Sequence, residues 1–271
     1  MSGFPGAGQK GTRFLLGLLP ILLLLILYLI VAADRNAINP NDKILPLPSA
    51  MGEAMWGLAF ERDRLSGRYL FWADTAASLY RLGIGLAIAT LSALVIGLLL
   101  GGLRSIRATF GPLVTGIAVI PPIALLPILF ITFGLGETAK VALIVIGITP
   151  FMVRDIAAYV AALPREQIVK AQTLGASTWQ LLLRVALPQA MPRLIQALRL
   201  SLGPAWVFLI SAEAIASDIG LGYRIFLVRR YLAMDVILPY VAWIAILAAS
   251  IDFLLAWASR RLFAWAHGEG Q

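Results

Sequence analysis

The chain has 271 residues, of which 60% are hydrophobic and 13% are charged, and its mean hydropathy is +0.88. This composition excludes an ordinary soluble domain and predicts an all-α integral membrane protein. The net charge of +8 is spread beside apolar runs instead of forming one patch, which favours a lipid bilayer over nucleic acid as the partner. The absence of cysteine excludes disulfides, thiolate chemistry and cysteine-based metal sites.

The first apolar run covers residues 14–33 and follows Lys10 and Arg13. It is long enough to cross a hydrocarbon core of about 30 Å. A cleaved signal peptide is the alternative, but a run of this length exceeds a normal signal core and favours a retained helix. Residues 34–71 are polar and proline-containing, and Ser49 is placed to cap a short amphipathic helix that ends at Phe60. We expect this segment to be an external loop or a helix lying along the membrane surface.

Further apolar runs predict five more spans, at residues 73–101, 112–133, 138–152, 194–214 and 239–258. Six spans place both termini on one side of the membrane. The basic residues at the two ends of the chain, Lys10, Arg13, Arg260 and Arg261, predict that this side is the cytoplasm.

Ionisable residues within spans are costly, so we expect them to be paired or functional. Arg199 in the fifth span and Asp252 in the sixth lie at a similar depth, roughly 8 to 9 Å from the cytoplasmic end. They are predicted to form an ion pair, either as a stabilising contact between helices or as part of a pathway. The lone histidine, His267, falls in the polar tail and is predicted to be solvated.

A second group of residues is predicted to lie along the transport pathway. Asp74 and Arg81 fall near the outer end of the second span, and Glu213 near the outer end of the fifth. Glu213 is equally well explained by a helix end or by a contact with the external loop. Pro121 and Pro122 must kink or unwind the third span, which fits either a packing kink or a gate.

The one long amphipathic interval covers residues 165–192 and is predicted to lie in the cytoplasm between the fourth and fifth spans. We expect a helix of about 12 residues, a turn at Gly175, and a second short helix that stops at Pro188. Such a hairpin can rest on the membrane or dock into a partner protein.

Within this interval the pattern A-x3-G-x9-V-x-L-P, from Ala171 to Pro188, resembles the cytoplasmic loop of ABC-importer permeases, E-A-A-x3-G-x9-I-x-L-P. Val169 and Lys170 replace the first Glu and Ala of that pattern. In the family, this loop forms coupling helices that sit in a groove of the ATP-binding subunit. We hypothesise that Glu166, close to one helical turn earlier, takes over the anchoring role of the missing Glu.

The resemblance implies a type I ABC importer (MetI-like) permease fold with six transmembrane helices. It also implies a second copy of the chain, two ATP-binding subunits that carry the ATP and Mg, and an external solute-binding protein. With Glu166 added by the hypothesis above, the residues predicted to contact the ATP-binding subunit are Glu166, Lys170, Ala171, Leu174, Gly175, Ala176, Trp179, Leu187 and Pro188. The predicted division is an N-terminal transmembrane helix plus an external loop or amphipathic helix at 1–72, a permease core at 73–263 with cytoplasmic coupling helices at about 165–192, and a polar tail at 264–271.

The segment 206–223, with A-E-A-I followed by G-L-G-Y, resembles the nitrate/sulfonate/taurine branch of these permeases. Three stretches, beginning N-P-N-D-K-I-L-P, F-W-A-D-T-A-A-S and G-L-G-Y-R-I-F-L, resemble permeases that accompany urea or guanidine carboxylases. The resemblance therefore implies an inner-membrane permease for a small polar solute. Guanidine or urea is the first candidate, and nitrate, taurine or another sulfonate is the alternative.

Two other classes of protein compete with this interpretation. An ion-coupled secondary transporter or channel would use its intramembrane ion pairs for coupling. An intramembrane enzyme is disfavoured because the sequence has no HExxH, no Ser-His pair in a span and no metal-ligand cluster. The sequence also lacks a G-x4-G-K-[ST] loop, so any ATP must be bound and hydrolysed by a partner, and no cofactor is expected in this chain.

Overall fold

A computed structural model describes residues 10–39 and 42–266 of the chain. The predicted all-α class is confirmed, because this described part is helical and contains no strand. In chain order the elements are α1 (Lys10–Ile38), α2 (Pro48–Phe60), α3 (Leu70–Gly102), α4 (Arg104–Val119), the 3₁₀ helix η1 (Pro122–Leu125), α5 (Leu126–Phe133), α6 (Glu137–Ala161), α7 (Arg165–Thr173), α8 (Thr178–Gln180), the π-helical η2 (Leu181–Ala186), α9 (Leu187–Ile215), α10 (Leu221–Val228), the 3₁₀ helix η3 (Arg229–Tyr231), α11 (Met234–Leu262) and the 3₁₀ helix η4 (Ala264–Ala266). His267 lies outside the described residues.

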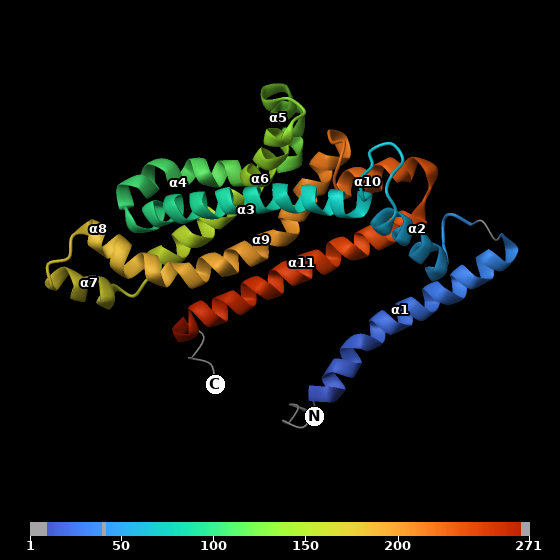
Figure 1. Cartoon of the computed structure of the whole chain (residues 1–271). Coiled ribbons are helices and arrows are strands. Elements are labelled where there is room, and N and C mark those ends of the chain that lie inside the picture. Colours follow the sequence, from blue (N-terminus) through green and yellow to red (C-terminus); the bar gives the residue numbers. More distant parts are fainter. Residues whose placement is uncertain (1–9, 40–41, 267–271) are drawn as a thin grey trace.

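The long helices α3, α6, α9 and α11 run side by side and form an elongated body (Figure 1). Helices α7 and α8 lie at one end of this body, which we call the hairpin end. Helices α2 and α10 lie at the other, which we call the opposite end. Helix α1 runs apart from the body and is tied to the segment before α2, since the Tyr28 hydroxyl donates to the Pro46 carbonyl at 2.7 Å.

Four helices of the described part are long and apolar enough to span a membrane: α3, α6, α9 together with α8 and η2, and α11. Helix α4 and the η1–α5 segment pass the same test together, but they meet at an angle of 89°. The third predicted span, which was expected to be kinked or unwound, is therefore a broken helix. Its break falls at Pro121 and Pro122, where proline removes backbone N–H donors. The count of six spans, which includes α1, stays a prediction.

Small residues let α3 and α6 approach closely. Every fourth position of α3 from Gly85 to Gly101 is glycine or alanine, and all five residues are buried. A Cβ atom added at Gly97 would lie 2.8 Å from the Cβ of Ile156, so α6 occupies the space that a side chain would need. Close packing of backbones over small residues is how helices associate in a bilayer, where the hydrophobic effect gives little driving force between them.

Three local predictions are corrected by the structure. Helix α2 begins at Pro48 with no side-chain cap, so Ser49 lies inside the helix and does not cap it. The second helix of the hairpin does not stop at Pro188, because η2 widens into a π-helix and leads without interruption into α9. Residues 215–238, which join the fifth and sixth predicted spans and were expected to form a polar loop, contain the helix α10.

Candidate functional site

A stripe of polar side chains interrupts the apolar surface of α3 near the opposite end. Asp74, Ser78 and Arg81 follow one another at spacings of four and three residues, so they share one face of the helix. All three are buried, with exposed fractions of 0%, 0% and 2%. Burying charges at this depth requires partners, which α6, α9, α10 and α11 provide.

Glu213 of α9 is the centre of one half of this network. Its carboxylate accepts hydrogen bonds from the Arg81 Nη1 at 2.6 Å, from the Ser78 hydroxyl at 2.8 Å and from the Gly222 backbone N–H at 2.8 Å. The side chain is completely buried. Glu213 therefore joins α3, α9 and the start of α10 through one carboxylate.

Asp74 is the centre of the other half. Its carboxylate accepts hydrogen bonds from the Arg224 Nε at 2.8 Å, from the Gly220 backbone N–H at 3.0 Å and from the Tyr240 hydroxyl at 3.2 Å. These donors come from α10, from the turn before it and from α11. The Asp74 carboxylate thus holds α10, the turn before it and α11 to α3.

The contacts of the first turn of α10 explain why the sequence at 220–222 is Gly-Leu-Gly. The consecutive N–H groups of Gly220, Leu221 and Gly222 donate to Asp74, Ser78 and Glu213. These are the N–H groups that a helix start leaves without internal partners, and negative charge is favourable there. Gly220 has φ of +137°, and a Cβ atom on it would lie 2.5 Å from the Glu213 Cδ. No other residue fits this position.

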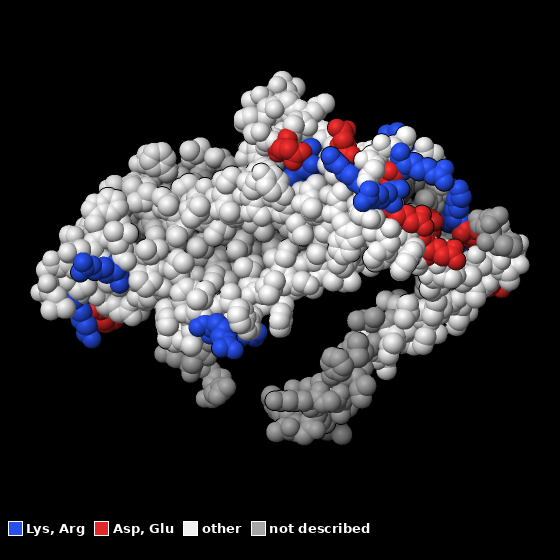
Figure 2. Space-filling view, in the orientation of Figure 1, with Lys and Arg blue, Asp and Glu red and all other residues white. Residues whose placement is uncertain are grey.

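The network ends at a partly exposed rim on α6. Arg81 forms an ion pair with Glu137, whose Oε1 accepts from the Arg81 Nη2 at 2.8 Å and from the Lys140 Nζ at 3.0 Å. The acidic members of the network are Asp74, Glu137 and Glu213, and the basic members are Arg81, Lys140 and Arg224. Three negative and three positive groups balance, so this network offers no excess charge to a passing ion. Figure 2 shows that charged side chains gather over this end of the molecule.

The structure brings the predicted residues Asp74, Arg81 and Glu213 together, but it buries them against one another instead of opening them to a cavity. Glu213 contacts Gly222, in the segment between the fifth and sixth predicted spans. Sequence reasoning missed Ser78, Arg224, Tyr240 and Glu137 as members of the network. The spacing of Asp74, Ser78 and Arg81 on one helix face was the available signal.

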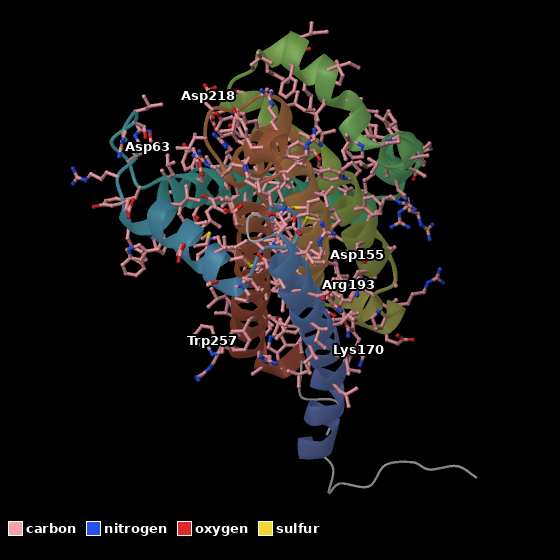
Figure 3. All side chains as sticks on the ribbon, turned by 90° about the vertical axis from the view of Figure 1, so that its right-hand side faces the viewer. Asp63, Asp155, Lys170, Arg193, Asp218 and Trp257 are labelled. Atoms are coloured by element: carbon pink, nitrogen blue, oxygen red, sulfur yellow. The ribbon has the colours of Figure 1, made fainter. Side chains whose placement is uncertain are left out.

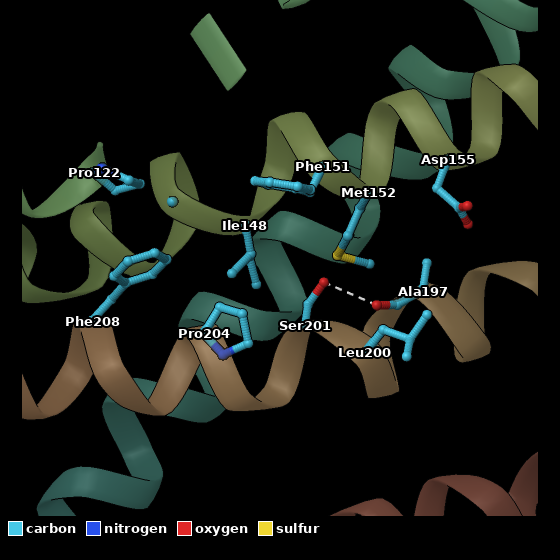
Figure 4. A pocket seen from close by; sticks show the side chains of 11 residues that line it. Pro122, Ile148, Phe151, Met152, Asp155, Ala197, Leu200, Ser201, Pro204 and Phe208 are labelled. Atoms are coloured by element: carbon cyan, nitrogen blue, oxygen red, sulfur yellow. Dashed lines mark hydrogen bonds between the residues drawn. The ribbon is translucent and has the colours of Figure 1, made fainter. Parts of the chain in front are cut away.

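Pro122, in contrast, lines a groove of about 310 Å³ between α6 and α9. Phe151 and Met152 of α6 face Leu200 and Pro204 of α9 across it (Figure 4). The remaining lining residues are Gly147, Ile148, Asp155, Ala197, Ser201 and Phe208. Apart from Asp155 these walls are uncharged. The Ser201 hydroxyl is directed to the Ala197 carbonyl at 2.9 Å.

Two ion pairs cross between helices toward the hairpin end. Asp155 of α6 pairs with Arg193 of α9, and the two lie next to each other in Figure 3. Arg199 of α9 donates from Nε and Nη2 to both carboxylate oxygens of Asp252 in α11, each at 2.8 Å. The predicted contact between Arg199 and Asp252 is therefore present. Both pairs are about one-third exposed, unlike the saturated network at the opposite end.

The hairpin turn is fixed by backbone and capping contacts. Gly175 has φ of +82°, its N–H donates to the Gln172 carbonyl, and the Ala176 N–H donates to the Ala171 carbonyl. This is a Schellman motif, which ends α7 and explains the spacing from Ala171 to Gly175 in the sequence pattern. Ser177 and Gln180 then form a capping box that starts α8.

Several apolar side chains of the hairpin are exposed at the end of the molecule. Leu174 is 88% exposed, Trp179 is 61% exposed and Val169 is 54% exposed. Glu166 and Lys170 are also exposed. Of the other predicted contact residues, Gly175 and Pro188 are exposed, Ala171 and Ala176 are half-buried, and Leu187 packs against the core.

Within residues 10–39 and 42–266, no group of three or more His, Cys, Asp or Glu side chains could hold a metal ion.

The family model for the binding-protein-dependent transport system inner membrane component matches residues 93–264. The chain belongs to this family. It is thus a non-catalytic permease component of an ABC importer, located in the inner membrane. Family membership decides against the alternative of an ion-coupled secondary transporter.

Named relatives support the predicted nitrate/sulfonate/taurine branch. The taurine transport system permease protein TauC of Escherichia coli is 38% identical over 227 residues, which cover 84% of this chain and 82% of TauC. The bicarbonate transport system permease protein CmpB of Synechococcus elongatus is 30% identical over 262 residues, covering 96% of this chain and 93% of CmpB.

A solved structure supports the MetI-like fold. A chain of the MetNI methionine ABC transporter, in an inward-facing conformation, superposes with a TM-score of 0.60 at 22% identity, and the match covers 72% of this chain and 94% of that one. At this identity the likeness concerns the fold alone.

Proposed function

We propose that this permease carries a small oxyanion, such as a sulfonate or bicarbonate, across the inner membrane. The observation that carries this proposal is the match over most of the chain to relatives named for taurine and bicarbonate transport. The α6–α9 groove, with Pro122 at the break of the third span, is the proposed part of the pathway in this chain. Helix breaks at membrane depth are tolerated where the freed backbone faces protein or a cavity.

The charge distribution supports a pathway that discriminates only weakly among solutes. Within the network near the opposite end, Arg81 and Arg224 are already bound to carboxylates. The groove walls are mainly apolar, so a solute passing through would meet few groups that hold it tightly. An external binding protein at the opposite end would then make the choice of solute.

The hairpin end of each chain is the proposed docking site for one ATP-binding subunit. Two copies of the chain would then bind two such subunits. Leu174 and Trp179 expose apolar surface beside the charged Glu166 and Lys170, which suits burial in a protein groove. ATP and Mg belong to those subunits. In this proposal the hairpin and both termini lie in the cytoplasm. Residues 73–263 form the permease core, 1–72 form a transmembrane helix and an external segment, and 264–271 form a polar tail.

Reconstitution tests the substrate. The permease would be purified with the ATP-binding subunit and the binding protein encoded beside it, placed in liposomes, and assayed for ATP-dependent uptake. Taurine, bicarbonate, nitrate, guanidinium and urea would be compared. We expect an oxyanion to be taken up and to stimulate ATP hydrolysis. Uptake of guanidinium or urea alone would overturn the oxyanion assignment and favour the carboxylase-associated resemblance.

The role of Glu166 has a separate test in the same preparation. Glu166→Ala is expected to weaken assembly with the ATP-binding subunit if this residue replaces the motif Glu absent at Val169. If Glu166→Ala leaves assembly and coupled ATPase activity intact while Gly175→Leu does not, the replacement hypothesis is wrong.

A further inference from the structure

A polar pocket of about 390 Å³ opens between α6, α9, α11 and η4, toward the hairpin end. Arg193, Arg199 and Gln196 of α9 line it together with Tyr159 of α6 and Trp265 of η4. Neither Asp155 nor Asp252, the carboxylate partners of the two arginines, lines this pocket. The two arginines therefore line a space that their partner carboxylates do not line.

Hydrogen-bond donors remain available in this pocket. Asp252 accepts from Nε and Nη2 of Arg199, which leaves the Nη1 amino group without a partner in the described part of the chain. Arg193 uses its Nη1 for one hydrogen bond, to the Gln196 Oε1 at 3.2 Å. Because that oxygen of Gln196 is an acceptor, its NH₂ group is a further donor. Guanidinium and amide donors without a facing carboxylate suit a ligand with several anionic oxygens.

The position of the pocket favours a lipid as the source of that anion. Helix α11 exposes Phe253, Leu254 and Trp257 along its outer surface, and it ends in Arg260 and Arg261. The Arg261 guanidinium lies 5.6 Å from the centroid of the Trp257 ring. Tryptophan and basic residues mark the boundary between the hydrocarbon and the headgroups. The pocket is lined by Ser259 near the same end of α11, on the face of that helix opposite to these exposed residues.

We propose that the pocket binds a tetrahedral oxyanion, a phosphate or sulfonate group, and that its occupant is the phosphate of an anionic phospholipid in the leaflet at the hairpin end. Arg199 Nη1 and the Gln196 amide donate to the phosphate oxygens. The site joins α9 and α11 from outside, in addition to the direct pair between Arg199 and Asp252.

The test is native mass spectrometry of the delipidated transporter, assembled with its ATP-binding subunits and titrated with phosphatidylglycerol or phosphatidylcholine. We expect one phosphatidylglycerol per permease chain to bind at least tenfold more tightly than phosphatidylcholine. Inorganic phosphate and taurine serve as competitors. If neither inorganic phosphate nor taurine displaces the lipid at millimolar concentration, the lipid headgroup is the occupant. If one of them displaces the lipid, a free oxyanion is a ligand of the same site.

Paired variants separate the pocket from the ion pair. Arg199→Gln and Asp252→Asn both break the pair, but only Arg199→Gln removes a donor from the pocket. We expect Arg199→Gln to weaken phosphatidylglycerol binding at least tenfold and Asp252→Asn to leave it equal or tighter. Gln196→Glu should also abolish binding, while Gln172→Glu, the same change on exposed α7, should not. The proposal is overturned if Arg199→Gln and Gln196→Glu bind phosphatidylglycerol as tightly as the unaltered chain does, and if the two variants also bind inorganic phosphate and taurine equally well.

Discussion

The two ends of the molecule treat charge and apolar surface in opposite ways. At the opposite end, three acidic and three basic side chains form a closed network in which Asp74, Arg81 and Glu213 are buried. At the hairpin end, ion pairs are partly exposed and apolar side chains such as Leu174 and Trp179 stand out from the surface. A saturated, buried network holds helices together, whereas exposed apolar surface calls for a partner. We infer that the opposite end is a fixed joint and that the hairpin end is completed by another protein.

The largest expected loss of stability comes from breaking the joint. Glu213→Ala leaves Arg81 with a buried charge that has lost one partner, and it leaves the Gly222 N–H without an acceptor. We expect a loss of about 3 to 5 kcal/mol in the free energy of unfolding, measured by denaturation of the purified chain in detergent. Glu166→Ala, at the exposed hairpin, is the control and should change it by less than about 0.5 kcal/mol. Similar losses for the two variants would remove the distinction between the ends.

Two glycines with positive φ allow a matched comparison. Gly220→Ala adds a methyl group against the Glu213 carboxylate, whereas nothing lies within 4 Å of a Cβ atom at Gly175. We expect Gly220→Ala to cost about 2 to 3 kcal/mol or more, and Gly175→Ala to cost about 1 to 2 kcal/mol from backbone strain alone. The same denaturation assay compares them. A larger loss for Gly175→Ala would contradict the close packing assigned to Gly220.

A smaller effect is expected from the ion pair between Arg199 and Asp252. The pair is partly exposed, with exposed side-chain fractions of 35% and 43%. Asp252→Asn should therefore lower the free energy of unfolding by less than about 1 kcal/mol. This loss should shrink further at high salt, because exposed pairs are screened. If Asp252→Asn lowers the free energy of unfolding as much as Glu213→Ala does, and independently of salt, the pair would behave like the ion pairs of the buried network.

Some elements followed directly from the sequence, and others required the three-dimensional contacts. Helices α3 and α11 were predicted because long, mainly apolar runs suffice to define them. The pairing of Arg199 with Asp252 was predicted from their equal depth. Helix α10 was missed because its first turn is held by Asp74, Ser78 and Glu213, which are distant in sequence.

In the hairpin, too, one feature was predictable from the sequence and another was not. Its turn at Gly175 was predicted from glycine alone, since a helix that ends in a Schellman motif needs a residue with positive φ. The expected stop at Pro188 was wrong because the helix runs on through the π-helical η2, whose wider turn directly precedes that proline, into α9. The network residues Arg224 and Tyr240 could not be assigned from the sequence, because nothing local records which helices meet α3.

The most direct test of the account is a paired measurement on Leu174→Asp in the assembled transporter. A charge at this exposed position should leave the unfolding midpoint of the isolated permease unchanged, because the side chain makes little contact within the chain. The same variant should lose the ATP-binding subunit during purification. Retention of that subunit by Leu174→Asp, with normal ATP-dependent uptake, would contradict the claim that the hairpin end is completed by the ATPase.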